Sequence, residues 1–193
     1  MNADTRIPHL LYDRWAMTHL TPANVPVVLQ TLLPGLDREH QTTKRVIEAI
    51  PDAKVDYTPD GISMSAIQLA WHIVTAENRF LEAVINGAFD LTPMTRPDSI
   101  KTADAVNRWY AERYAKNAAQ LQALPAEKLA KIIDFRGVMQ LPAVAYIDFA
   151  LRHSIHHRGQ LSMYLRPMGA KVPSIYGESY DARVAREAAQ APA

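Results

Sequence analysis

The stretch HSIHHRGQLSMYLRPMG, from His153 to Gly169, holds three of the seven histidines of the chain within five residues. It belongs to a segment with helical periodicity that we expect to begin near Pro142 and to run to about Arg166. Proline suits the first turn of a helix, and Pro167 with Gly169 ends the pattern. The stretch therefore predicts a long helix with several imidazoles on its surface.

Three earlier segments have the same periodicity, and prolines or turn residues separate them. In the second of these, Ser65 and Gln68 have the spacing of a capping box at a helix start. Residues 125–140 look like a connection with a short helical turn and an extended piece, and such a linker can run the length of a bundle. The sequence therefore predicts an all-α fold, a four-helix bundle with a long crossover. The three earlier helices are expected at Pro34–Ile50, Ser65–Gly87 and Ile100–Leu124.

Composition limits the classes of protein and of site. The 193 residues, 48% hydrophobic and 21% charged, suit one globular domain. A net charge of +1 without a basic block disfavours nucleic-acid binding. The absence of cysteine excludes disulfides, thiolate metal ligands and a cysteine nucleophile, so any reactive site must use nitrogen and oxygen. No secretion signal or membrane span is evident, which predicts a cytoplasmic protein without membrane contact.

The domain organisation that we expect has three parts. An N-terminal extension, residues 1–30, packs on the bundle, and residues 31–170 form the metal-binding bundle itself. The C-terminal tail, residues 171–193, contains the sequence VPSIYGESYD, whose aromatic side chains could pack on the bundle, before an alanine-rich end.

His153 and His157 have the spacing of a pair of metal ligands. Four residues apart on a helix, their side chains project about 40° from each other on one face. Pairs of histidines at this spacing recur in zinc sites. The same face carries apolar residues, so the pair should point into the bundle, where no acidic residue lies one turn away to pair with it.

A third ligand is expected from another inward-facing helix, and His72 is the natural candidate because it borders the apolar stripe of the second helix. Three neutral histidines leave a position open for a water or a substrate thiol, as in catalytic metal sites. The alternative for His72 is a core histidine hydrogen-bonded to a carbonyl or a tyrosine. The ion is expected to be divalent, with zinc or nickel favoured by imidazole ligands.

Several other polar residues are weaker candidates for the site. Catalytic residues are not identified by the pattern, although Gln160 and Tyr164 follow His157 at successive turns. Gln160 could hydrogen-bond a bound water or substrate, or simply a neighbour on its helix, and Tyr164 could form a wall of the pocket. Glu77 is expected to be a solvated or inter-helix residue, because it lies about 140° around the helix from His72. His156 is turned away from the pair, His40 could face the same cavity or lie in the core, and His9 and His19 are assigned to the surface.

These residues resemble the DinB family, the DinB/YfiT-like proteins. The resemblance covers about residues 34–180, and it is carried by SMSAIQLAWHIVTAENRF, HSIHHRGQLSMYLRPMG and the following VPSIYG. Its most specific element is the HxxxHRGQ pattern with an upstream histidine on the second helix. The resemblance implies a four-helix bundle, commonly a homodimer, and a divalent ion held by residues that match His72, His153 and His157 here.

The resemblance also implies an activity. Relatives with known activity use the ion to activate a low-molecular-weight thiol for transfer or isomerisation, which suits a chain without cysteine. We therefore expect a metal-dependent transferase, isomerase or hydrolase that acts on a small molecule through a thiol or a water. The alternative is a non-catalytic metal- or ligand-binding helical bundle in a stress response.

Overall fold

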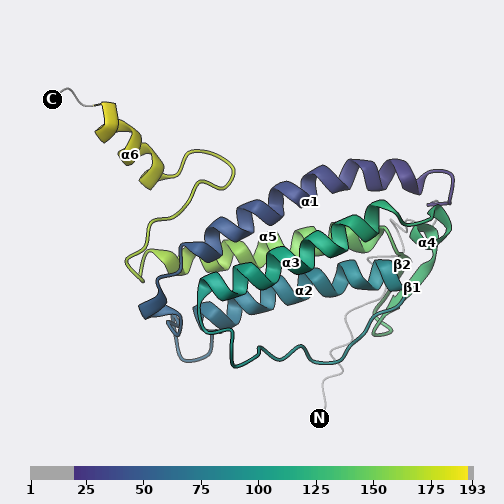
Figure 1. Ribbon diagram of the computed structural model, residues 1–193, viewed down its shortest axis with the longest axis horizontal. Helices are drawn as coiled ribbons and strands as arrows, with labels where there is room; N and C mark the ends of the chain where they lie inside the picture. The colour runs from purple at the N-terminus through teal and green to yellow at the C-terminus, as the bar shows by residue number, and fades with distance from the viewer. Residues whose placement is uncertain (1–19, 191–193) are drawn as a thin grey trace, which may run out of the picture.

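The computed structural model describes residues 20–190, and its regular secondary structure is almost entirely helical (Figure 1). Four long helices lie side by side, and each of α1 and α2 packs against both α3 and α5. The predicted four-helix bundle is therefore confirmed. The elements are α1 (Val25–Glu48), α2 (Ala66–Asn86), α3 (Ala103–Gln122), α4 (Ala126–Ala130), β1 (Ile132–Phe135), β2 (Met139–Pro142), α5 (Ala145–Leu165) and α6 (Tyr180–Gln190), with a short 3-10 turn at Asp52–Lys54.

Helix α2 begins and ends where local chemistry dictates. The Ser65 side chain accepts a hydrogen bond from the backbone of Gln68, and the Gln68 side chain accepts one from the backbone of Ser65. Gly87 ends the helix at a φ of 71°, a left-handed conformation that glycine adopts without a steric penalty. The predicted capping box and the predicted stop are both confirmed. Local signals therefore define both ends of the helix that carries His72.

Helix α1 begins nine residues before the predicted start at Pro34. That prediction was wrong because Pro34 lies inside the helix, and Pro26 occupies the first turn instead. Burial of Val25, Leu29 and Leu36 favours the longer helix despite the hydrogen bond that an internal proline removes. The helix thus reaches into residues 25–30 of the predicted N-terminal extension, while residues 1–19 of that extension lie outside the described part of the chain.

The long crossover lies between α2 and α3 rather than in residues 125–140. Residues 87–102 run along the length of the bundle, so α2 and α3 point the same way (Figure 1). Residues 125–140 stay at one end, where α4 is followed by an antiparallel hairpin that pairs Ile132 with Pro142 and Phe135 with Met139. The predicted helical turn and extended piece are confirmed there. The fourth helix starts at Ala145, slightly after the expected Pro142, which ends β2.

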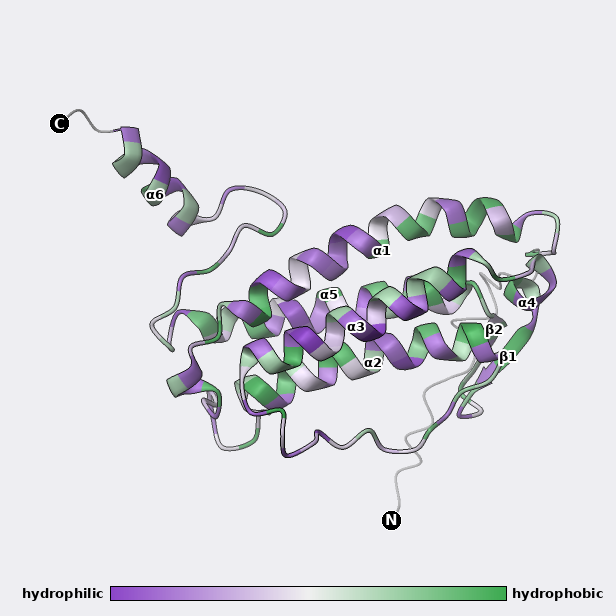
Figure 2. Ribbon diagram, viewed as in Figure 1, coloured by the Kyte–Doolittle hydropathy of each residue, from purple (hydrophilic) through white to green (hydrophobic). Residues whose placement is uncertain are grey.

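The core consists of two clusters of buried apolar side chains, one toward each end of the bundle, and hydrophobic residues recur along the long helices (Figure 2). On α5, one cluster ends at Leu151 and the other begins at Leu161. The intervening turns carry His153, His157 and the buried Arg158. Polar chemistry is therefore concentrated in the middle of the bundle, between two apolar halves.

Within residues 20–190, none of the helices combines the length and the apolar character that crossing a membrane requires. Helix α6 lies apart from the bundle in Figure 1, and none of its residues is buried.

Candidate metal site

Three histidines from two helices converge in the middle of the bundle. The candidate ligand nitrogens of His72, His153 and His157 all lie within 4.8 Å of one another. The Nε2 atoms of His72 and His157 are 3.3 Å apart, and the ring centroid of His153 is 5.0 Å from that of His72 and 4.4 Å from that of His157. The structure thus brings together the three residues that the sequence predicts as ligands.

The surroundings keep these imidazoles in the form that binds metal. Burial lowers the pKa of His72, and the nearby charge of His157 lowers it further. Burial and the neighbouring histidines lower the pKa of His153 to about 4. Both side chains are therefore neutral at pH 7, and a neutral imidazole has a lone pair available for coordination.

The ring of His157 is oriented by a partner on its own helix. Its Nδ1 lies 2.7 Å from Oε1 of Gln160, which can only accept, so Nδ1 carries the proton. The lone pair of His157 is then on Nε2, the atom that faces His72. A hydrogen bond of this kind fixes the tautomer of metal-binding histidines. Of the two roles expected for Gln160, a hydrogen bond to a neighbour on its own helix is the one that the structure shows.

The donor set fits a divalent ion. Three imidazole nitrogens form a set typical of zinc and related ions, and they are close enough to share one ion. Nδ1 of His153 is buried and has no hydrogen-bond partner among the described protein groups. Two partly buried nitrogens that face each other, as in His72 and His157, are unfavourable unless a proton or a cation lies between them. A bound cation would remove the unfavourable contact between the His72 and His157 nitrogens.

A cavity of about 970 Å³, which we call the histidine cavity, opens beside the cluster. His72 and His153 form part of its wall, together with residues of the 87–102 connection, the hairpin and α5. Its size suits a small organic molecule. Trp71 closes one side, and its indole nitrogen donates a hydrogen bond to the carbonyl of Met94 at 2.9 Å, which ties the crossover connection to α2.

The other candidate residues are not part of the three-histidine group. Tyr164 packs edge-to-face on Tyr57 at 5.8 Å between ring centroids, and it does not line the histidine cavity. His156 is exposed and contacts Gln160. His40 is a core histidine, stacked on Tyr114 with 3.7 Å between ring centroids. His9 and His19 lie outside the described residues.

Glu77 provides a buried carboxyl group whose contacts the sequence did not predict. Glu77 is fully buried between helices, so it is an inter-helix residue and not a solvated one. It accepts hydrogen bonds from Tyr110 at 2.6 Å and from Ser154 at 2.7 Å. Burial raises the pKa of Glu77 to about 7, although these hydrogen bonds oppose the rise. The only signal in the sequence is an acidic residue that interrupts a largely apolar helix.

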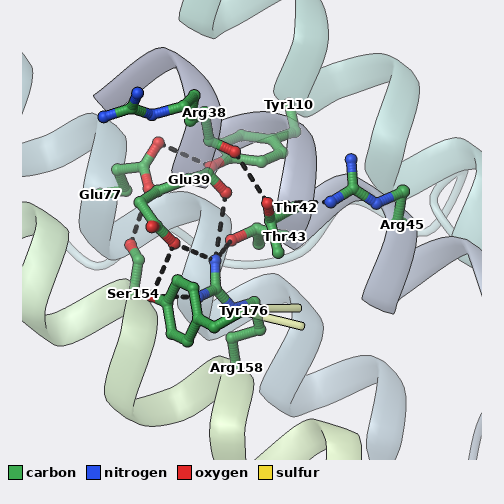
Figure 3. Close-up of polar contacts among 10 residues, drawn as sticks. All are labelled: Arg38, Glu39, Thr42, Thr43, Arg45, Glu77, Tyr110, Ser154, Arg158 and Tyr176. Carbon is green, nitrogen blue, oxygen red and sulfur yellow. Dashed lines mark hydrogen bonds and ion pairs between the residues drawn. The ribbon is translucent and has the colours of Figure 1, made fainter. Parts of the chain in front are cut away.

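A buried ion pair lies beside this group (Figure 3). The Arg158 guanidinium, 1% exposed, is 2.5 Å from the Glu39 carboxylate of α1. Arg158 also donates to the Tyr176 hydroxyl at 2.7 Å, and that hydroxyl donates to Glu39 at 3.0 Å. Arg158 follows His157 directly on α5. Its contacts with Glu39 and Tyr176 thus join α5 to α1 and to the C-terminal tail. The aromatic packing predicted for the tail includes this Tyr176 contact.

Comparisons with known proteins agree with the fold. The model of the DinB family matches residues 23–188. The uncharacterized protein YjoA of Bacillus subtilis strain 168 is 29% identical over 129 residues, which are 66% of this chain and 82% of that protein. The uncharacterized protein YrdA of the same organism is 27% identical over 155 residues, 77% of this chain and 88% of that protein.

Two solved structures share the architecture. The crystal structure of the DinB-like protein YjoA from Bacillus subtilis aligns with a TM-score of 0.63 and 27% identity, over 76% of this chain and 96% of that one. A DinB-like protein from Bacillus cereus ATCC 10987 aligns with a TM-score of 0.66 and 23% identity, over 76% and 97%. Because the family model spans most of the sequence, the chain belongs to the DinB family.

Proposed function

We propose that this protein is a metal-dependent enzyme that activates a small thiol or a water at His72, His153 and His157. The observation that carries the proposal is the convergence of three candidate ligand nitrogens within 4.8 Å of one another, with two of these histidines, His72 and His153, lining the histidine cavity. A purely structural site is usually closed by four protein ligands, whereas three ligands beside a cavity suit a catalytic site. Zinc or nickel is the ion that we propose, because imidazole suits both.

The chain supplies binding, orientation and shielding. A divalent ion held there would lower the pKa of a coordinated thiol or water and so provide a nucleophile at neutral pH. Gln160 holds the His157 ring with Nε2 toward the cluster. Phe80 and Phe149, whose ring centroids are 4.9 Å apart, exclude water along the cavity wall. Since the chain has no cysteine, a thiol would have to come from a cosubstrate.

Elemental analysis of protein purified without a histidine tag tests the first step. We expect about one equivalent of a transition metal in the natural protein, and less than about a tenth after His157→Ala. His156→Ala is the matched control, because it removes an imidazole from the neighbouring, exposed position and should leave the metal content unchanged. Equal loss in both variants would contradict the ligand assignment.

A screen of thiols with electrophiles, run beside thermal unfolding with and without chelator, tests the second step. Metal-dependent conjugation or hydrolysis supports the enzyme. A protein that the metal stabilises but that is inert toward every thiol and electrophile tried would instead indicate a non-catalytic metal-binding bundle. Pairing of two copies remains a prediction from the family, and analytical ultracentrifugation tests it.

A further inference from the structure

The histidine cavity carries positive charge that the metal site does not explain. Among residues 20–190, three arginines line it: Arg79 on α2, Arg96 in the crossover connection and Arg136 in the hairpin turn. The described residues that line this cavity include no aspartate or glutamate. Three segments far apart in the sequence therefore bring guanidinium groups to one cavity without supplying a counter-charge in its wall.

These guanidinium groups retain most of their hydrogen-bonding capacity. Arg79 donates to the carbonyl of Thr92 at 2.6 Å, and Arg96 donates to the carbonyl of Ile100. In residues 20–190, none of the three lies in an ion pair with a carboxylate. Hydrogen bonds with Thr92 are the largest cause of the lowered pKa of Asp90 and the charge of Arg79 is the smallest, and Asp90 does not line the cavity. Each guanidinium has five donors, so several remain for a ligand.

The arginine on α2 lies on the same helix face as the metal ligand. Arg79 follows His72 by seven residues, which is close to two full turns and about 10 Å along the helix axis. Phe80, Phe135 and Phe149 line the same cavity, with ring centroids 5.5 Å apart between Phe80 and Phe135. A small molecule with an apolar body could therefore lie against these rings, with one end at the histidines and the other at Arg79.

Arg136 occupies a backbone conformation that arginine rarely adopts. The hairpin turn closes with a hydrogen bond from Val138 to Phe135, and its two central residues have φ angles of 59° at Arg136 and 68° at Gly137. A turn of this kind favours asparagine or aspartate at the first position. Arg136 is the only residue other than glycine with a positive φ in the described part of the chain. Its guanidinium lies 5.7 Å from the Phe135 ring centroid, at the cavity.

We propose that the histidine cavity binds a small organic molecule that carries a carboxylate or a similar oxyanion, which Arg79, Arg96 and Arg136 hold while its apolar body extends toward His72 and His153. Guanidinium groups match the geometry of planar oxyanions and can donate two parallel hydrogen bonds. This inference rests on the proposed function only in placing the reacting end of the molecule at the histidines. The anion site itself consists of arginines and does not require the metal.

Isothermal titration calorimetry with three probes, a matched acid and amide and an inorganic anion, tests the anion site. The probes are 4-phenylbutyrate, its neutral amide 4-phenylbutanamide, and inorganic phosphate, each titrated into metal-loaded protein. We expect the carboxylate to bind at least about tenfold more tightly than the amide. It should also bind more tightly than phosphate, which has no apolar body. Equal binding of acid and amide would overturn the proposal. Phosphate that binds as tightly as the carboxylate would contradict the proposal that the ligand is an organic molecule.

Charge-removing variants locate the site. Arg79→Gln and Arg136→Gln should each weaken 4-phenylbutyrate binding about five- to tenfold and leave amide binding unchanged. Arg152→Gln is the matched control: it removes the same charge next to His153, but its side chain is 77% exposed and pairs with Asp148 outside the cavity. Equal weakening in all three variants would mean a general charge effect and would overturn the assignment.

A last variant separates this proposal from the metal site. In His157→Ala the arginines are intact, so the preference for the carboxylate over the amide should persist at a similar ratio. Loss of that preference would show that the acid binds through the metal, which overturns the arginine site. Natural protein that takes up no metal but still prefers the acid would contradict the proposed enzyme while supporting the anion site.

Discussion

The Ser154 hydroxyl donates a 2.7 Å hydrogen bond to the Glu77 carboxyl group, one residue from His153. This bond joins α5 to α2 at the level of the histidine cluster, and Tyr110 adds α3 through the other oxygen of Glu77. Three of the four bundle helices thus meet at one buried carboxyl group. Because polar groups in a core must find particular partners, such a contact sets the height of α5 against α2. The relative positions of His72 and His153 depend on that height.

Glu77 should make the stability of the protein depend on pH. Its pKa is raised from 4.5 to about 7, so in this window the folded protein holds a proton that the unfolded chain releases. The stabilisation from this group is complete below pH 4.5 and decreases as the pH rises to about 7, by up to about 3 kcal/mol. Denaturant unfolding of the natural protein and of Glu77→Gln, at a series of pH values, measures the difference.

The control for this prediction is Glu112→Gln, which changes an exposed glutamate on α3. Glutamine at position 77 can still accept from Tyr110 and donate to Ser154, so the variant should fold. Free energies of unfolding of the natural protein and of Glu77→Gln that change in parallel from pH 4.5 to 7 would show that burial does not raise the pKa of Glu77.

Gln160 should increase metal affinity without touching the ion. Gln160→Ala removes the acceptor for Nδ1 of His157, frees the ring to change tautomer, and is expected to weaken metal binding about tenfold. Gln160→Glu should retain the affinity, since a carboxylate accepts the same hydrogen bond. Competition with a chromophoric chelator measures both. An unchanged affinity in Gln160→Ala would mean that packing alone orients His157.

The sequence predicts the helices and the candidate ligands where short-range chemistry decides them. Ser65 with Gln68, the glycine at 87 and the spacing of His153 and His157 are all local signals, and each predicts what the structure contains. The prediction of a third candidate ligand required only that His72 face inward. Its convergence with the pair then followed from the packing of α2 on α5.

Long-range relationships could not be predicted in the same way. Residues 87–102 and 125–140 are similar in length, and nothing local shows that the second folds back at Arg136 and Gly137. The partners of Glu77 lie 33 and 77 residues away, and Glu39 lies 119 residues before Arg158. Such pairs depend on the arrangement of the helices, which helical periodicity does not specify.

His40 should weaken the fold in acid. Burial, and to a smaller extent the charge of Lys44, lowers its pKa from 6.5 to about 3. The unfolded chain therefore binds a proton more readily than the folded protein, and stability present above pH 6.5 is lost as the pH falls toward 3, by up to about 1.4 kcal/mol per pH unit. His40→Phe keeps the stacking on Tyr114 and should lower the pH of acid unfolding. The exposed His156→Phe is the control, and an equal shift in both variants would contradict the assignment.

Tyr176 should hold the tail to the bundle. Tyr176→Phe removes the hydroxyl that bonds Arg158 and Glu39 while leaving the ring against the guanidinium, 5.4 Å from its centroid. We expect a loss of about 1 kcal/mol in unfolding free energy and faster cleavage by trypsin at Lys171, measured by mass spectrometry of timed digests. Tyr180→Phe is the matched control, because Tyr180 contacts Arg166 through its ring. The buried ion pair of Arg158 with Glu39 persists in both variants, so the bundle should stay folded while the tail opens. Equal cleavage rates in the two variants would show that the hydroxyl of Tyr176 does not retain the tail.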